Sequence, residues 1–337
     1  MDIADESPTA IASYAPEEGG RGMSMLNAMY YFFKPFLPQS ARYTMRRLRA
    51  NYKLQTAKDW PIMESAGEKP PGWPGWPDGK KFALVLTHDV EGQVGLERCQ
   101  QLAELEMKHG FRSSFNLIPE GEYTVTREFR DFMTESGFEI GVHDLRHDGS
   151  LYRNRKSFDE CAVAINSHLR DWDAVGFRAG FMFHNLEWLK SLEIDYDAST
   201  FDTDPFEPQP DGAGTIFPFV VRGRTPDEGY VELPYTLPQD ATLYLILREQ
   251  TNHIWKAKTD WLAERGGMVL VNVHPDYLAF DGRKPEISEF DASLYEDLLC
   301  HVKEKYAGQY WNPLPREMSQ YIAGMSPFAP GPRTTLQ

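Results

Sequence analysis

The fold is decided by the stretch Phe82-Ala-Leu-Val-Leu-Thr-His-Asp-Val-Glu-Gly92. Its first five residues are apolar and include a valine, which is typical of a strand buried on both faces of a sheet. The polar residues that follow place Asp89 and Glu91 at the carboxyl end of that strand, where α/β proteins bind their ligands. Because they are two apart on an extended chain, both carboxylates point to one side and repel each other unless a cation or basic group lies between them. A turn with solvated acids is the alternative interpretation.

Strand and helix patterns alternate after this stretch. The predicted strands are 82–86, 111–118, 138–143, 174–178, 195–199 and 268–274, and the predicted helices are 96–108, 126–135, 157–170, 186–192, 251–265, 288–305 and 315–323. Repeated strand–helix units indicate a parallel sheet, either closed as a barrel or open. Residues 201–240 are rich in Pro, Gly and Asp and are predicted to form a long functional loop with short strand-like pieces.

Composition excludes several classes of protein. The chain has 337 residues, enough for one large barrel-type domain with extensions or for two smaller domains. Its formal net charge of −15 disfavours nucleic-acid binding. Cys99, Cys161 and Cys300 form no CxxC pair, so neither a disulfide framework nor a thiolate zinc site is expected, which fits a reducing compartment. The acidic amino terminus and the lack of a long apolar run lead us to expect a cytoplasmic protein.

Residues 1–80 read as an amino-terminal arm, followed by a catalytic domain over 81–325 and a tail over 326–337. The arm begins with a segment expected to be disordered and continues with an aromatic segment and a basic helix over 40–53 that Ser40 can cap. This basic helix could contact an anionic membrane surface, but we favour packing on the acidic body of the same protein. The stretch 70–77 is a stiff Pro/Trp linker whose tryptophans either pack on the next domain or face a sugar.

Histidine occurs at three of the polar strand ends, in the stretches 87–91, 141–147 and 272–276, and Arg178 ends another strand. His143 and His147 are four residues apart, so on a helical turn both rings can reach one metal ion. Two imidazoles and one carboxylate leave coordination positions open, which is the layout of a catalytic metal site. Taken alone, the HxxxH spacing is also typical of solvated or capping histidines.

These motifs resemble those of the polysaccharide deacetylase family, the NodB-homology hydrolases of N-acetylated sugars (carbohydrate esterase family 4). The family's first motif corresponds to Thr87-His-Asp-Val-Glu91, its second to His143-Asp-Leu-Arg-His147, its third to Arg178 and its fifth to Val271-Asn-Val-His274. The match extends over roughly 81–280. The resemblance implies a distorted (β/α)-barrel of about seven strands. It also implies that Asp89 is the general base, His274 the general acid, and Arg178 the residue that orients the base.

The resemblance further implies that His143, His147 and an acid of the first motif hold the metal. Here Val90 replaces the family's second Asp, so Glu91 becomes the third ligand, and which of Asp89 and Glu91 is the base stays open. For the role of the family's fourth motif, Asp197 and Asp202 are both candidates to support His274. His88 should point away from Asp89 and is interpreted as structural.

The predicted activity is metal-dependent removal of an acetyl group from an N-acetylated sugar or glycan precursor. One divalent ion is expected, with zinc as the first choice and cobalt, nickel or iron as substitutes. Two alternatives remain: an amidohydrolase of a small nitrogenous compound, which a narrow arginine-lined pocket would favour, and a catalytically silent carbohydrate-binding module. The silent module is favoured if Glu91 cannot reach the metal and the 201–240 loop blocks the groove. The oligomeric state cannot be predicted.

Overall fold

A computed structural model describes residues 39–209, 211–223 and 228–325. The expectations for the first 22 residues, for the aromatic segment that follows them and for the tail over 326–337 therefore lie outside the described residues. In the described part of the chain, no helix combines the length and the apolar character that crossing a membrane requires.

The central strand is β1 (Phe82–Val90), whose nine residues are all buried, as predicted for a strand covered on both faces. It pairs in parallel with β2 (Ser114–Leu117) on one side and with β8 (Met268–Asn272) on the other. The sheet continues from β2 through β3 (Glu139–His143), β4 (Gly176–Arg178), β5 (Tyr196–Asp197) and β7 (Gly229–Glu232), all parallel. At its far edge β6 (Phe219–Arg222) is antiparallel to β7, and β11 (Tyr310–Trp311) pairs with the first residues of β1.

The sheet curls into a distorted barrel that closes through an irregular segment. The backbone N–H groups of Thr236 and Leu237, just after β7, both donate to the carbonyl of Leu270 in β8, at 3.0 Å. The Thr236 hydroxyl donates to the carbonyl of Met268 at 2.8 Å and accepts from the N–H of Leu270 at 2.9 Å. The distorted (β/α)-barrel is thus confirmed, with a side-chain hydroxyl replacing part of the ladder.

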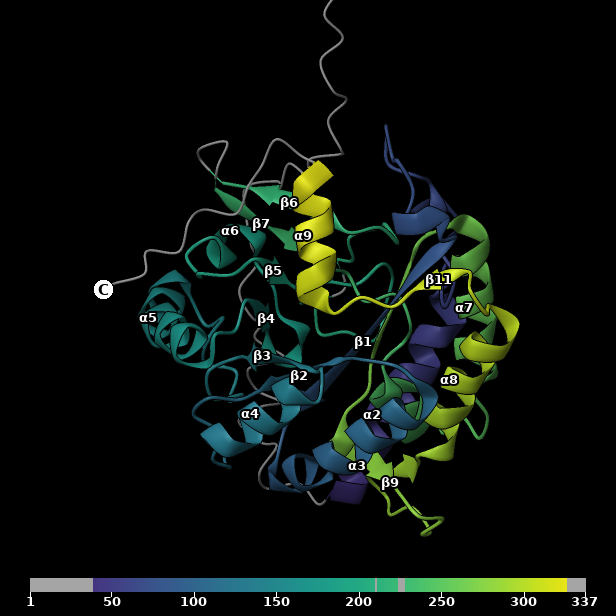
Figure 1. The fold of residues 1–337 in the computed structure, drawn as a ribbon. Helices are drawn as coiled ribbons and strands as arrows, with labels where there is room; N and C mark the ends of the chain where they lie inside the picture. Colours follow the sequence, from purple (N-terminus) through teal and green to yellow (C-terminus); the bar gives the residue numbers. More distant parts are fainter. Residues whose placement is uncertain (1–38, 210, 224–227, 326–337) are drawn as a thin grey trace, which may run out of the picture.

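Helices surround this sheet (Figure 1), and most lie where the sequence predicts them: α3 (Gln93–His109), α4 (Arg127–Glu135), α5 (Arg155–Trp172), α6 (Leu186–Leu189), α7 (His253–Arg265), α8 (Ser293–Lys305) and α9 (Pro315–Met325). The Thr126 hydroxyl caps α4 by accepting from the N–H of Phe129, as predicted. Several further elements were not predicted, among them a π-helical turn over Ala241–Leu247 and the short strands β9 (Leu278–Ala279), β10 (Phe290–Asp291) and β11. The three cysteines are free.

The helix α2 (Gln39–Thr56) packs on the body of the protein, which is the alternative we favoured. The guanidinium of Arg47 donates to the carbonyl of Leu245 at 3.2 Å, and the ammonium of Lys53 donates to the carbonyl of Pro205. The Pro/Trp linker packs on the following domain as well, since the indole N–H of Trp76 donates to the carbonyl of Gly266 at 2.8 Å. The amino-terminal side of the described chain is therefore docked against the barrel.

Candidate active site

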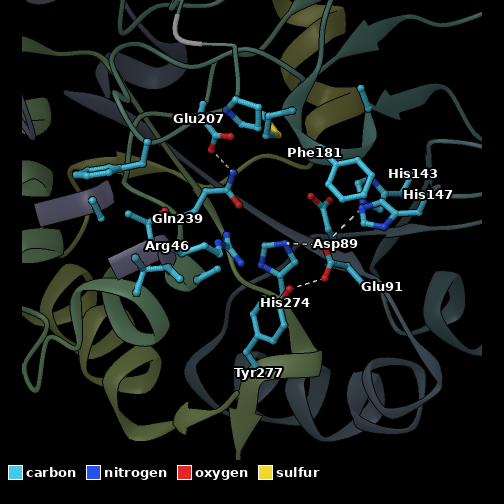
Figure 2. A pocket seen from close by; sticks show the side chains of 18 of the residues that line it. Arg46, Asp89, Glu91, His143, His147, Phe181, Glu207, Gln239, His274 and Tyr277 are labelled. Carbon is cyan, nitrogen blue, oxygen red and sulfur yellow. Dashed lines mark hydrogen bonds and ion pairs between the residues drawn. The ribbon is translucent and has the colours of Figure 1, made fainter. Parts of the chain in front are cut away.

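The carboxyl ends of β1, β3 and β8 open into one cavity of about 560 Å³. Asp89, Glu91, His143, His147 and His274 all line it (Figure 2). Parallel strands end at the same edge of a sheet, which explains how residues almost two hundred positions apart in sequence meet here. The shared rim that the sequence predicts is thus present.

Three side chains in the cavity form a group that could hold a metal ion. The potential ligand atoms of Glu91, His143 and His147 lie within 4.8 Å of one another, and Glu91 Oε1 is 3.5 Å from His147 Nε2. His143 Nδ1 lies 3.1 Å from the carbonyl of Arg178, which accepts its proton and leaves the Nε2 lone pair free. The Nε2 atoms of both histidines are buried without a hydrogen-bond partner among the described residues. Buried, unpaired imidazole nitrogens are unfavourable, so the donor set fits a divalent cation.

The two imidazoles converge by a different route from the helical turn that their spacing suggested. His143 is the last residue of β3, and His147 lies in the loop beyond it. Asp144 and His147 have φ angles of 56° and 55°, in the left-handed region. The helical-turn expectation is therefore wrong, because the chain reverses through two left-handed residues to bring the ring centroids within 4.9 Å.

The backbone and the side chain of Glu91 are both held in place. The Tyr277 hydroxyl donates to Glu91 Oε2, and the N–H of Glu91 donates to the Asp276 carboxylate at 2.9 Å. Burial alone would raise the pKa of Glu91, but the nearby His147 and His274 and the Tyr277 hydrogen bond outweigh it and lower the pKa to about 2. Glu91 is therefore an ionised carboxylate directed at the histidines.

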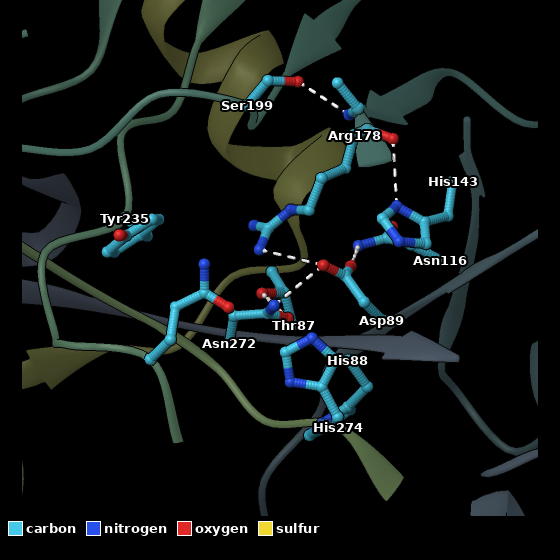
Figure 3. A network of polar contacts seen from close by, with 12 residues as sticks. Thr87, His88, Asp89, Asn116, His143, Arg178, Ser199, Tyr235, Asn272 and His274 are labelled. Carbon is cyan, nitrogen blue, oxygen red and sulfur yellow. Dashed lines mark hydrogen bonds and ion pairs between the residues drawn. The ribbon is translucent and has the colours of Figure 1, made fainter. Parts of the chain in front are cut away.

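Asp89 accepts a hydrogen bond on each carboxylate oxygen (Figure 3). The side-chain amide of Asn116 donates to Oδ1 and that of Asn272 to Oδ2, both at 2.8 Å. Arg178, whose side chain is completely buried, has its Nη1 atom 3.6 Å from Asp89 Oδ2, too far for a hydrogen bond but close enough for an ion pair. Burial would raise the pKa of Asp89, yet Arg178 and then His143 outweigh it and hold the pKa well below its usual range.

His274 is supported by Asp240, and not by the two aspartates proposed from the sequence. His274 Nδ1 lies 2.7 Å from Asp240 Oδ1, and Asp240 Oδ2 accepts from the N–H of His274, also at 2.7 Å. Burial lowers the pKa of His274, but Asp240 outweighs burial and raises it to about 10. Nε2 faces the cavity, 3.9 Å from Glu91 Oε1.

The expectation that Asp197 or Asp202 supports His274 is corrected by their own partners. Asp197 accepts from the Ser199 hydroxyl at 2.7 Å, and Asp202 forms a buried ion pair with Lys258 at 2.8 Å. Each carboxylate is thus already paired with a residue other than His274. His88 is structural as predicted, because its ring bonds to the carbonyl of Val273 and to Glu106.

Sequence reasoning missed four residues that position the site: Asn116, Asp240, Asn272 and Tyr277. Asn272 stood within the quoted end of the late strand, and Tyr277 follows the His-Pro-Asp sequence at that end. Asn116 lies in β2, where the alternation that aims Asp89 into the barrel also aims its amide there. Asp240 ends the long loop region, and no pattern in the sequence distinguishes it from the other acids there.

No family model matches the sequence, and no curated protein does. Among solved structures, the chain is similar to a protein from Mycobacterium smegmatis provisionally named a polysaccharide deacetylase. The TM-score is 0.57 and the identity 18%, over 78% of this chain and 97% of that one. The chain has the fold of that deacetylase.

Two more distant structures are also similar. Peptidoglycan deacetylase PdaC from Bacillus subtilis gives a TM-score of 0.44 at 12% identity, over 74% of this chain and 96% of that chain. A family 4 acetyl xylan esterase from Clostridium thermocellum, in complex with a cobalt ion, gives 0.43 at 11% identity, over 73% and 94%.

Proposed function

We propose that this protein is a metal-dependent hydrolase that removes the acetyl group from an N-acetylated sugar or glycan precursor. The observation that carries the proposal is one cavity with three complementary parts. It contains an ionised, hydrogen-bonded Asp89, a His274 whose pKa is raised by Asp240, and the Glu91, His143 and His147 group with its unpaired imidazole nitrogens.

The proposed roles follow from these environments. Glu91, His143 and His147 would hold a divalent ion, with zinc as the first candidate because imidazole and carboxylate suit it. Such an ion, when bound, supplies a Lewis acid that polarises the acyl oxygen and makes water more acidic. Asp89 stays ionised and so can accept a proton from the attacking water, while Arg178 fixes its orientation. His274 stays protonated at neutral pH and can donate to the amine, which leaves poorly without a proton.

The test combines metal analysis with acetate release. The purified protein should contain or bind one zinc ion per chain and should release acetate from N-acetylglucosamine oligomers. Asp89→Asn is the control, since it should keep the metal and lose the reaction. A protein that binds no metal and releases no acetate from any N-acetylated sugar contradicts the proposal.

A second candidate, an amidohydrolase of a small nitrogenous compound, is favoured by the arginines at the cavity. Arg46, Arg49 and Arg146 line it, and α2 contributes one of its walls. Hydrolysis of small N-acyl amines without activity on any N-acetylated sugar would select this candidate. The silent binding module is disfavoured, because Glu91 reaches His147 and because the residues of the 201–240 loop that reach the cavity form part of its wall.

A further inference from the structure

The wall of the cavity that α2 provides is cationic. Arg46, Arg49 and Lys53 line the cavity together with Asp89 and His274. Their spacing of three and four residues places the three cations on one face of the helix. Figure 2 shows Arg46 on the opposite side of His274 from His143 and His147. A ligand that reaches the metal-binding group therefore also meets these cations.

Two of these cations have no anionic partner in the part of the chain that the structure describes. Arg146, elsewhere in the cavity, is paired with Glu120 at 2.6 Å, and Lys53 donates to a backbone carbonyl. No hydrogen bond or ion pair joins Arg46 or Arg49 to a described residue. Burial lowers the pKa of Lys53, and the repulsion from Arg49 lowers it further, so these positive charges are close together. In a chain with a net charge of −15, such a cluster is a local exception.

Glu207, an acid that lines the cavity together with this cluster, is already hydrogen-bonded to other residues. Glu207 Oε1 accepts from the Tyr235 hydroxyl at 2.8 Å and from the Gln239 amide at 2.6 Å. Burial, and then the neighbouring Asp204, raise the pKa of Glu207 to about 8. Its hydrogen bonds go to Tyr235 and Gln239, and no ion pair joins Glu207 to Arg46 or Arg49 among the described residues.

We propose that the substrate carries an oxyanion group, a phosphate or a carboxylate on the sugar, which Arg46 and Arg49 bind while the N-acetyl group lies beside Asp89. This inference rests on the proposed function. Guanidinium groups match the geometry of phosphate and carboxylate oxygens and bind them in bidentate fashion. The cavity volume of about 560 Å³ lies within the range of about 300–1,000 Å³ typical of small-molecule sites. The part of the substrate that enters the cavity is therefore a negatively charged N-acetylated sugar.

The test measures binding, so that it does not depend on turnover. Calorimetry on zinc-loaded Asp89→Asn protein would compare neutral N-acetylglucosamine disaccharide, N-acetylglucosamine 1-phosphate and the carboxylate-bearing N-acetylmuramic acid. The double variant Arg46→Gln/Arg49→Gln removes the cations, and Arg46→Lys/Arg49→Lys keeps the charge. The matched control is Arg127→Gln/Lys156→Gln, which removes two exposed positive charges on α4 and α5, outside the cavity lining.

We expect at least one anionic sugar to bind about tenfold more tightly than the neutral one, as two charge-assisted contacts allow. The glutamine variant should lose this preference, with the neutral ligand changed less than about twofold, while the lysine variant keeps part of it and the control keeps all. Added salt should weaken only the anionic ligand. The phosphate and carboxylate arms show which oxyanion is preferred.

Three results would overturn the inference. In the first, no anionic sugar binds more tightly than the neutral one. In the second, the glutamine variant loses affinity equally for neutral and anionic ligands, and in the third, the control variant loses as much of the preference for the anionic sugar as the glutamine variant does. Thermal melting of each variant separates these results from misfolding. Acetate release is scored separately on the parent protein. Tight binding of the anionic sugar without acetate release supports the anion site and contradicts the proposed hydrolase. Acetate release from neutral sugars alone supports the hydrolase and contradicts the anion site.

Discussion

Asp89 accepts from two amide donors, so the substitution Asp89→Asn changes the hydrogen bonds of the site as well as removing the base. Asn116 and Asn272 each donate to one carboxylate oxygen, and an asparagine offers a single acceptor oxygen. Its amino group must therefore face a donor, and Arg178 loses its counter-ion. We expect turnover to fall by about 10²–10⁴-fold because the base is lost. We also expect the free energy of unfolding to fall by about 1–3 kcal/mol because a buried donor is left unpaired.

Acetate release, metal content and a denaturant melt check this prediction together. The metal should stay, since Asp89 does not belong to the Glu91, His143 and His147 group. Near-normal turnover would move the general base to Glu91.

Asp240 sets the protonation of His274, so Asp240→Asn should move the pH profile. The pKa of His274 is raised from 6.5 to about 10, chiefly by the charge of Asp240 acting against burial. A general acid is active below its pKa, so the activity of the parent should persist until the pH approaches that value. Without the carboxylate the pKa of His274 falls, and the alkaline limb of kcat/KM should move to lower pH. An unchanged alkaline limb in a folded variant would remove His274 from the role of acid.

At the scale of elements, the loop after β3 is pressed against the segment after β4. A Cβ atom on Gly180 would lie 2.5 Å from Asp144 Oδ2 and 2.8 Å from His147 Cδ2. Such contacts are too close, so the loop that carries His147 must shift if Gly180 gains a side chain. The close approach of two connections thus sets the position of a metal-binding imidazole.

Gly180→Ala should therefore weaken zinc binding by about tenfold or more while the fold persists. Gly324→Ala is the matched control, because Gly324 lies in α9 with open space around its Cβ position. The control should keep its zinc affinity and gain up to about 1 kcal/mol in the free energy of unfolding. Chelator competition and denaturant melts measure both quantities. Equal zinc affinity in the two variants would show that the loop yields without moving His147.

At the scale of the whole molecule, an acidic chain buries acids and so makes its stability depend on pH. The pKa of Glu207 is raised to about 8 in the folded protein, by burial first and then by Asp204, against an ordinary value of 4.5. Between these two pKa values, Glu207 is therefore protonated in the folded state and ionised in the unfolded state. This contribution to stability is complete below pH 4.5 and is lost as the pH rises through about 8.

Glu207→Gln should remove this pH dependence. Relative to the variant, the parent should lose free energy of unfolding between pH 5 and pH 8, because only the parent has a carboxyl group to ionise. Glu122→Gln, which changes an exposed acid of the same cavity, should leave the slope of the parent unchanged. Denaturant melts at both pH values measure the difference. Parallel pH dependence in the parent and Glu207→Gln contradicts the prediction.

The amino-acid sequence alone predicts the main parallel strands, most of the helices and the identity of the polar strand ends. Local periodicity carries that information: a run such as 82–86 is buried on both faces, and the residues after it must project from the carboxyl edge of the sheet. Asp89, Glu91, His143, His147 and His274 could therefore be named and placed on one rim before any coordinates. Even the opposite orientation of His88 follows from the two-residue period of a strand.

Which side chain supports which depends on tertiary contacts. Asp240, and not Asp197 or Asp202, bonds to His274 because the segment after β7 lies beside β8 where the barrel closes. His147 reaches His143 through left-handed residues, whose conformation the spacing does not reveal. The cations of α2 enter the cavity because the helix docks on a part of the chain about two hundred residues away. Such contacts join segments whose separation in sequence bears no relation to their distance in space, so no local pattern encodes them.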